Sequence, residues 1–525
     1  MDRDAWTSLE AEVATLPLEV RVERLRHFLN ANRTHVEARL SLALTLWASL
    51  QSEDALIQVK QVLDQEPGHA VARGIYFMML ELSGAWEELL VEAECAAAID
   101  PLDQQANSSR TFALIETSRF AEACVEREAF ADHLLQATEQ PRTKLTRLLS
   151  ADRLEEARAL IAATPDAPSL FGTLDFDRFA AAGKLKPGTP QPQAVDTPRR
   201  LVLALTVRDE LELIATNLAW HFAQGVDAVI VTDNGSVDGT RELLAEISSK
   251  APVFVLDEPT QDMDQARWST RMVWLAREAL GADWVILADA DEFWAPHAGT
   301  LAAVIEEATR GVFAQATTLH LSSQLLLMDL EAGKAGQPTL PNATRRFQRP
   351  LPRLDYAPSG WDTSMAPWMV QFDKVWVRAG CWPLVAHGNH AAYTANPLVV
   401  PVTGAIGLHA SVRSFELFER KLIRFAEGFA RNTAPNDRAN GAIWVQGLPE
   451  WRIRGTIPQL YARSVFGHPF HHWAEAEGRI VPEHRVATLA ANLPPWPGAG
   501  LTAAEHARIA ASLADLADRL PRFLA

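Results

Sequence analysis

The sequence predicts a multidomain protein, with an all-α helical-repeat domain, an α/β domain built on a mostly parallel sheet, and a helical C-terminal tail. Three features of the 525 residues support this: a 34-residue repeat, a Pro-rich segment after it, and short apolar runs that then alternate with helical patterns. We expect the repeats at 1–181, a linker at 182–198, the α/β domain at 199–434 and a mixed loop and helical region at 435–525.

The first third of the chain repeats with a period of 34 residues. Small and large side chains recur at this spacing, at Ala38, Ala72 and Ala106 and at Leu46, Leu80 and Leu114. Small residues let paired helices approach closely, and large ones fill the groove between neighbours. The period and pattern resemble the tetratricopeptide repeat family, which implies a concave surface able to hold a peptide or a partner protein. Unrelated helical hairpins are the alternative interpretation.

The chain changes character after the repeats. Residues 182–198 are rich in proline and poor in large apolar side chains, as is typical of a linker. Beyond them, apolar runs lie at 200–207, 227–232, 252–256 and 284–288, and helical patterns lie at 210–224, 239–249 and 265–280. This alternation predicts a three-layer α/β domain, in which ligands bind at the carboxyl ends of the strands.

The pattern is weaker beyond residue 310. Residues 329–364 contain proline and glycine throughout and are expected to form loops. A further strand is expected at 374–380, an amphipathic helix at 414–432 and a final helix at 502–520.

Two carboxylates follow directly after the fourth apolar run. Side chains at i and i+2 of an extended segment point the same way, so Asp289 and Asp291 can present oxygens to one hard cation, Mg²⁺ or Mn²⁺. A second copy of this D-x-D pattern, Asp262 and Asp264, lies in a loop before a helix. Acidity at a helix N-terminus explains that copy better.

Four segments, in order, resemble a family 2-like glycosyltransferase with the glycosyltransferase A (GT-A) fold. They are TVRDE at 206–210, TDNGSVDGT at 232–240, WVILADADEFW at 284–294 and LHASVRSFELFERK at 408–421. The resemblance implies a transferase that takes a sugar from a nucleotide-linked donor, with UDP-, GDP- and CMP-sugars all open.

The resemblance also implies roles for residues at matching positions. They are Thr206, Arg208, Glu210 and Asp233 for the nucleotide pocket, Asp289, Asp291 and His409 for the metal, and Lys374, His390 and Lys421 as further candidates at the diphosphate. Asp233 would accept a hydrogen bond from the nucleobase. The metal, Mn²⁺ or Mg²⁺, would bridge the donor's phosphates, which also places Asp289 at the donor.

The chemistry of such a transfer asks for two further things. Departure of a nucleoside diphosphate builds negative charge on phosphate oxygens, which a divalent cation and nearby Lys or Arg stabilise. An inverting transfer also needs a carboxylate that deprotonates the acceptor hydroxyl. Asp362 is our first choice for this base, and Glu292, Asp355 and Asp373 are alternatives.

Composition limits the partners and the compartment. The 66 acidic residues exceed the 49 Lys and Arg, and a formal charge of −17 disfavours nucleic-acid binding. Three scattered cysteines, no signal-peptide pattern and no apolar run long enough to span a bilayer predict a cytoplasmic protein without a transmembrane segment. Peripheral attachment at the inner membrane stays open.

The sequence therefore predicts a metal-dependent glycosyltransferase that acts on a glycan or protein acceptor, with repeats that dock the acceptor or a partner protein. Two alternatives remain. One is a GT-A-like nucleotidyltransferase, although Arg208 lacks the flanking glycines of a phosphate loop. The other is a non-catalytic repeat scaffold whose transferase domain has lost turnover.

Overall fold

The computed structural model describes residues 2–167, 170, 195, 198–329, 340–353, 374–394, 396–431, 448–449, 451–498 and 500–519. These residues form two compact units. Residues 2–130 and 451–456 make up the first unit, and the other described residues make up the second. The predicted linker falls outside the described residues except at Val195 and Pro198.

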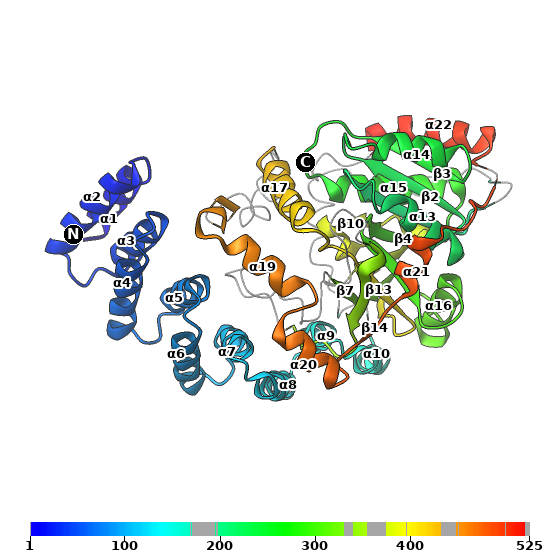
Figure 1. The fold of residues 1–525 in the computed structure, drawn as a ribbon. Coiled ribbons are helices and arrows are strands. Elements are labelled where there is room, and N and C mark those ends of the chain that lie inside the picture. The colour runs from blue at the N-terminus through cyan, green and yellow to red at the C-terminus, as the bar shows by residue number, and fades with distance from the viewer. Residues whose placement is uncertain are drawn as a thin grey trace. The chain divides into compact units, whose positions relative to one another are not determined.

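The first unit is an array of paired helices (Figure 1). The helices are α1 (Asp2–Val13), α2 (Leu18–Ala31), α3 (Val36–Ala48), α4 (Ser52–Gln65), α5 (Ala70–Ser83), α6 (Trp86–Ile99), α7 (Gln104–Glu116) and α8 (Phe120–Gln136), whose last residues belong to the second unit. The side chains that recur every 34 residues are all 0% exposed, at Ala38, Ala72, Ala106, Leu46, Leu80 and Leu114. The predicted all-α helical-repeat class is confirmed for this part of the chain.

The helix caps recur with the same period. The side chains of His35, His69 and Asp103 each accept a hydrogen bond from a backbone N–H three residues further on, at the start of α3, α5 and α7. Each cap satisfies a donor that the first turn of a helix leaves unpaired. The 34-residue repeat therefore extends to the helix caps as well as to the buried side chains.

A segment from the C-terminal part of the chain completes the first unit. The Arg454 guanidinium lies 3.6 Å from the centroid of the Trp47 ring and also donates to the Trp47 carbonyl oxygen. It donates a further hydrogen bond of 3.1 Å to Ser52 Oγ, 402 positions away. Trp451, on the same segment, is 1% exposed. The repeat array thus takes part of its packing from residues 451–456.

The second unit is built on a seven-stranded sheet with the order β12-β6-β9-β4-β1-β2-β3. The strands are β1 (Leu201–Val207), β2 (Ala228–Asp233), β3 (Val253–Asp257), β4 (Trp284–Asp289), β6 (Thr318–Leu321), β9 (Lys374–Arg378) and β12 (Val399–Pro401). Strands β3, β2, β1 and β4 are parallel, β9 runs antiparallel to both of its neighbours, and β12 is parallel to β6. The predicted α/β class with a mostly parallel sheet is confirmed.

Helices cover both faces of this sheet. Leu203 and Leu205 of β1 share a core with Ile214 and Leu218 of α13 (Ile214–Ala223) and with α14 (Thr240–Ser248). Val202 and Ala204 point the other way, into a core with α15 (Gln265–Leu280). Burial on both faces is why β1 reads as a continuous apolar run. The predicted final helix, α22 (Ala503–Arg519), contacts α15, and its Arg508 donates to the Ala279 carbonyl 2.9 Å away.

A second sheet of five strands has the order β14-β8-β7-β13-β5. The strands are β5 (Glu292–Pro296), β7 (Ser323–Met328), β8 (Ala343–Phe347), β13 (Ala405–His409) and β14 (Ile480–Pro482). The prediction of loops across 329–364 is wrong at β8. Two arginines interrupt its apolar pattern, yet Arg345 pairs with Asp329 (2.7 Å) and Arg346 lies 3.4 Å from Glu483. Those partners are distant in sequence, so no local pattern marks the strand.

Shorter elements complete the described chain. They are α9 (Pro141–Ser150), α10 (Leu154–Ala163), α16 (Leu301–Ala308), α17 (Phe415–Arg431), α19 (Thr456–Ser464), α20 (Pro469–Ala476), α21 (Arg485–Ala491), β10 (Leu384–Val385) and β11 (Ala392–Tyr393), with 3₁₀ turns at Gly311–Phe313, Leu340–Asn342, Ala379–Cys381 and His387–Asn389. Helices α9 and α10 belong to the second unit, where Leu148 and Ile161 share a core with the sheet. Helix α17 is the amphipathic helix predicted at 414–432.

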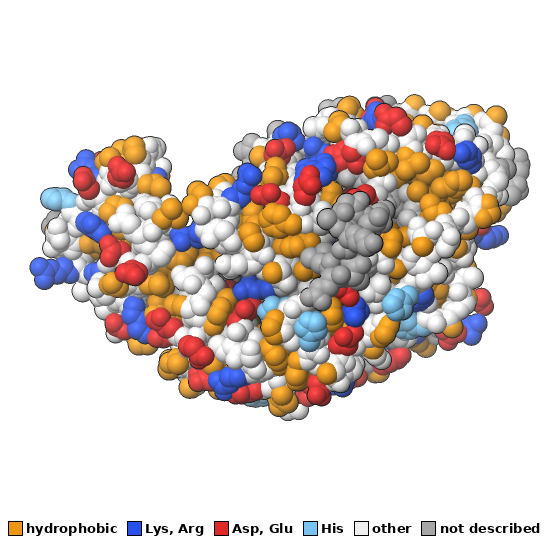
Figure 2. All heavy atoms as spheres, viewed as in Figure 1, with side chains coloured by type: hydrophobic (Ala, Val, Ile, Leu, Met, Phe, Trp, Pro, Cys, Tyr) orange, Lys and Arg blue, Asp and Glu red, His pale blue; other side chains and the backbone are white. Residues whose placement is uncertain are grey.

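Figure 2 shows acidic and basic side chains interspersed over one face of the protein. The acidic surplus of the sequence is therefore not gathered into a single acidic patch on that face. No helix among the described residues has the length and apolar character needed to cross a membrane.

Gly407 of β13 lies in close contact with its neighbours in the second sheet, two residues before His409. A Cβ placed on Gly407 of β13 would lie 2.7 Å from the ring of Trp294, which is 0% exposed. We predict that Gly407→Ala lowers the free energy of unfolding by about 1–3 kcal/mol through overpacking. Urea unfolding followed by tryptophan fluorescence measures this.

The matched control lies three residues earlier. A Cβ on Gly404 would make an ordinary contact of 3.6 Å with Val304, so Gly404→Ala should leave the unfolding midpoint nearly unchanged. Equal destabilisation by the two variants would show that the close contact at Gly407 does not limit the packing.

Candidate active site

The predicted acid pair lies where the chain passes from one sheet to the other. Strand β4 of the seven-stranded sheet ends at Asp289, and strand β5 of the five-stranded sheet begins at Glu292. The turn between them carries Asp291. Three carboxylates therefore occupy four consecutive positions at the carboxyl edge of the parallel strands, where α/β sheets bind ligands.

Asp289 has both carboxylate oxygens engaged. One accepts a hydrogen bond of 2.6 Å from Gln265 Nε2, and the other lies 2.8 Å from Lys374 Nζ. Lys374 also lies 3.0 Å from Glu292 Oε1, with side chains only 5% and 1% exposed. Burial alone would lower the pKa of Lys374, but the two carboxylates outweigh it and raise that pKa, so the ammonium stays charged. Burial raises the pKa of Glu292.

Asp291 meets two other cationic groups. It forms an ion pair with Lys421 of α17, and its Oδ1 lies 3.4 Å from His409 Nε2 at the end of β13. Burial opposes ionisation, but Lys421 and His409 hold the pKa of Asp291 well below its usual range. The antiparallel pairing of β13 with β5 sets His409 opposite Glu292 and so brings the imidazole to this turn.

Asn217 of α13 holds the turn through hydrogen bonds to its backbone. The sequence did not predict this residue as part of the site. Its fully buried side-chain amide donates to the carbonyl oxygens of Ala290 (2.9 Å) and Glu292 (2.7 Å). Burial lowers the pKa of the neighbouring His221 to about 4, so its imidazole stays neutral. His221 can then accept from the backbone N–H of Trp294, at 3.4 Å.

Arg208 and Glu210 follow β1 and contact the loop before α15 and the segment before α17. Arg208 donates to the Gln261 carbonyl (3.3 Å) and side chain (3.2 Å), and Glu210 pairs with Arg413 at 2.5 Å. Thr206 lies in register with Asp289 across the β1–β4 ladder. Its hydroxyl oxygen is buried and has no hydrogen-bond partner among the residues described. This edge of the sheet is therefore polar and partly unsatisfied.

Asp209 joins the loop after β1 to the loop after β2, and Asp233 stabilises the turn that follows its own strand. Asp209 adopts φ 52°, accepts from the Val237 N–H at 2.6 Å and pairs with Arg424 at 2.8 Å. Asp233 is fully buried, accepts from the Ser236 N–H (3.1 Å) and pairs with Arg241 (2.8 Å). These contacts give Asp233 a role in shaping the turn, and its predicted hydrogen bond to a nucleobase stays a prediction.

The remaining predicted residues lie elsewhere or outside the description. Among the candidate bases, Asp355, Asp362 and Asp373 all fall outside the described residues. His390 is exposed, whereas its neighbour His387, which sequence reasoning missed, feels the charges of Asp289 and Lys374. Burial lowers the pKa of His387. Across the described part of the chain, no group of three or more His, Cys, Asp or Glu side chains is placed to hold a metal ion.

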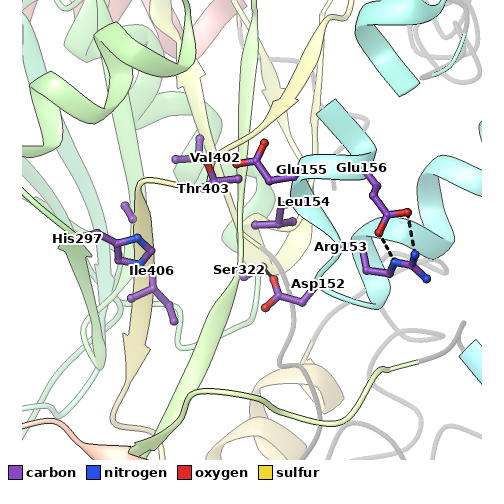
Figure 3. Close-up of a pocket in the computed structure, with 11 residues that line it drawn as sticks. Asp152, Arg153, Leu154, Glu155, Glu156, His297, Ser322, Val402, Thr403 and Ile406 are labelled. Atoms are coloured by element: carbon purple, nitrogen blue, oxygen red, sulfur yellow. Dashed lines mark hydrogen bonds and ion pairs between the residues drawn. The ribbon is translucent and has the colours of Figure 1, made fainter. Parts of the chain in front are cut away.

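A cavity of about 300 Å³ lies elsewhere in the second unit (Figure 3). Asp152, Glu155 and Glu156 line it from the turn before α10 and from α10 itself, and His297 lines it from the other side. Ser322 lies beside Asp152 and donates a hydrogen bond to it. None of the predicted site residues contributes to this cavity.

No protein-family model matches the chain, and no curated protein matches it in sequence. Solved structures with partial likeness include MamA from Desulfovibrio magneticus RS-1, with 13% identity over 30% of this chain and 88% of that chain and a TM-score of 0.22. The Thermobaculum terrenum O-GlcNAc transferase shows 17% identity over 52% of this chain and 45% of that chain, with a TM-score of 0.21. S. aureus TarS 1-349 in complex with UDP shows 10% identity over 57% of this chain and 99% of that chain, with a TM-score of 0.24. TM-scores this low bear on neither fold nor activity.

The amide of Asn217 gives a direct test of how the acid turn is held. Asn217→Asp keeps the shape but replaces the donor with an acceptor that faces two carbonyl oxygens. We predict a loss of about 3 kcal/mol in the free energy of unfolding, because buried acceptors lose their partner. Urea unfolding at neutral pH measures it.

The control is Asn492→Asp, an exposed asparagine after α21 in the same unit. It should change the free energy of unfolding by less than about 0.5 kcal/mol. If Asn217→Asp is equally mild, the Asn217 amide does not hold the turn.

Proposed function

We propose that this protein is a glycosyltransferase that moves a sugar from a nucleotide-linked donor to a glycan or protein acceptor. The observation that carries the proposal is the convergence of Asp289, Asp291 and Glu292 with Lys374, Lys421 and His409 at the carboxyl edge of β4. Buried lysines beside carboxylates suit a reaction in which negative charge grows on departing phosphate oxygens.

The residues present fit a divalent cation at Asp291 and His409. Their side chains come within 3.4 Å, and Mg²⁺ and Mn²⁺ sites commonly combine one or two protein ligands with phosphate oxygens. A cation there would supply charge stabilisation for the diphosphate. Asp289 fits less well, because Gln265 and Lys374 already use its two oxygens. We propose that Asp289 positions Lys374 and that Mn²⁺ or Mg²⁺ binds through the other two residues.

The chain's own cations divide the remaining work in this proposal. Lys374 supplies a nearly buried ammonium, and Lys421 brings a second ammonium from α17. Glu292 is 1% exposed and tied to Lys374, which suits a positioning residue rather than a base that meets an acceptor hydroxyl. The base stays assigned, from the sequence, to Asp362. We further propose that the helical repeats dock the acceptor or a partner protein.

Donor binding tests the proposal. We expect one of the UDP-, GDP- or CMP-sugars to raise the melting temperature in the presence of Mn²⁺, and the protein to hydrolyse that donor slowly. Asp291→Asn removes a charged ligand and should cut the hydrolysis rate by about 100-fold or more. Thermal shift and release of free nucleotide are the two measurements.

Asp283→Asn is the matched control, because Asp283 lies beside the opposite end of β4 with its side chain 46% exposed. It should leave donor binding and hydrolysis unchanged. Absence of stabilisation by every donor would contradict the glycosyltransferase and favour the scaffold, and transfer of a nucleotide rather than a sugar would favour the nucleotidyltransferase.

A further inference from the structure

The two lysines at the acid turn are held very differently. Lys374 lies on β9, contacts two carboxylates and is 5% exposed, so it has little room to leave. Lys421 lies on α17 and, among the described residues, forms an ion pair with one carboxylate, Asp291. Its side chain is 25% exposed, while that of Asp291 is 4% exposed. The Lys374 ammonium is therefore nearly buried between two carboxylates, and the Lys421 ammonium is partly exposed.

Lys421 forms an ion pair with Asp291, the carboxylate that would bind the proposed cation. Asp291 Oδ2 accepts from Lys421 Nζ, while Oδ1 lies near His409. A divalent cation bound at Asp291 and His409 would therefore share this carboxylate with an ammonium. Two positive charges a few ångströms apart repel strongly in a partly buried site. Cation and ammonium cannot both be well bound there.

The charged groups near Lys421 do not offer its ammonium a second carboxylate. Glu210 attracts it but is already paired with Arg413 at 2.5 Å, and Arg413 repels it. Its Nζ lies 5.8 Å from the centroid of the Phe425 ring, one turn further along α17. An ammonium freed from Asp291 would thus find no vacant carboxylate among these neighbours. The phosphates of a donor would offer it a new anionic partner.

We propose that Lys421 is a displaceable counter-ion, which neutralises Asp291 in the empty protein and moves to the departing diphosphate when cation and donor bind. This inference rests on the proposed function. It explains how a buried carboxylate is kept paired before the cation arrives. It also makes cation and donor binding favour each other, since each draws Lys421 away from Asp291.

The test compares Mn²⁺ binding without nucleotide, measured by electron paramagnetic resonance, in the full chain and its variants. Lys421→Met should bind Mn²⁺ at least about fivefold more tightly than the wild type, because the competitor is gone. Lys421→Arg keeps the charge and can bind the carboxylate through two N–H groups, so it should bind Mn²⁺ more weakly than the wild type. Lys250→Met, which removes an exposed partner of Glu246, is the control that should change nothing.

A second measurement, of nucleotide binding, should change in the opposite direction from Mn²⁺ binding. In saturating Mn²⁺, Lys421→Met should bind UDP or GDP several-fold more weakly, because the ammonium no longer meets the diphosphate. A merely structural lysine would weaken both ligands together. If Lys421→Met does not fold, Lys421→Arg carries the test, since a tighter grip on Asp291 should weaken Mn²⁺ binding measurably.

The outcomes separate the two proposals. The inference is overturned if Lys421→Met gains no Mn²⁺ affinity, if Lys421→Arg gains as much as Lys421→Met, or if a folded Lys421→Arg alone binds Mn²⁺ like the wild type. If the expected order of Mn²⁺ affinities holds but neither UDP nor GDP binds any variant, displacement from Asp291 stands and the transfer to a diphosphate fails with the proposed donor chemistry.

Discussion

The site depends on giving three closely spaced carboxylates cationic partners in a largely buried turn. Removing ionised groups from water is strongly unfavourable unless each finds a partner. Asp289 and Glu292 share Lys374, and Asp291 has Lys421 and His409. Each partner arrives on a different element, so the positions of β9, β13 and α17 around the end of β4 are tied to this charge balance.

This requirement gives a physical reason for the irregular part of the sheet. Strands β1 to β4 form a regular parallel layer, but β9 runs antiparallel beside β4 and begins with Lys374 at the edge where β4 ends. Likewise β13 runs antiparallel to β5 and ends with His409 opposite Glu292. Both antiparallel pairings bring a cationic or titratable group to the acid turn. In a purely parallel arrangement the turn would lack these two groups.

The parts of the fold that local pattern controls were predictable. The 34-residue period gives the buried positions of the repeats, and the apolar runs give β1 to β4 and the helices between them. What was missed depends on distant pairing. Strand β8 carries two arginines whose carboxylate partners lie up to 137 positions away. Asn217 reads as an ordinary helix residue until the chain folds and sets two carbonyl oxygens 73 and 75 positions away against its amide. The acidic site residues were predicted from strand ends, and Lys374 and Lys421 were candidates from the family resemblance. The pairing of each lysine with one aspartate, 85 and 130 positions away, was not predicted.

The return of residues 451–456 to the helical array bears on how such a chain can be rearranged in evolution. Arg454 covers the Trp47 ring from a short segment that interrupts the sequence of the second unit, so the repeats do not end where their period ends. A gene fusion that took only the N-terminal third would leave the Trp47 indole without its contact to Arg454. A fusion that removed this third would leave residues 451–456 without their packing partner. Modular exchange of this array therefore has to carry two separate stretches of the gene at once.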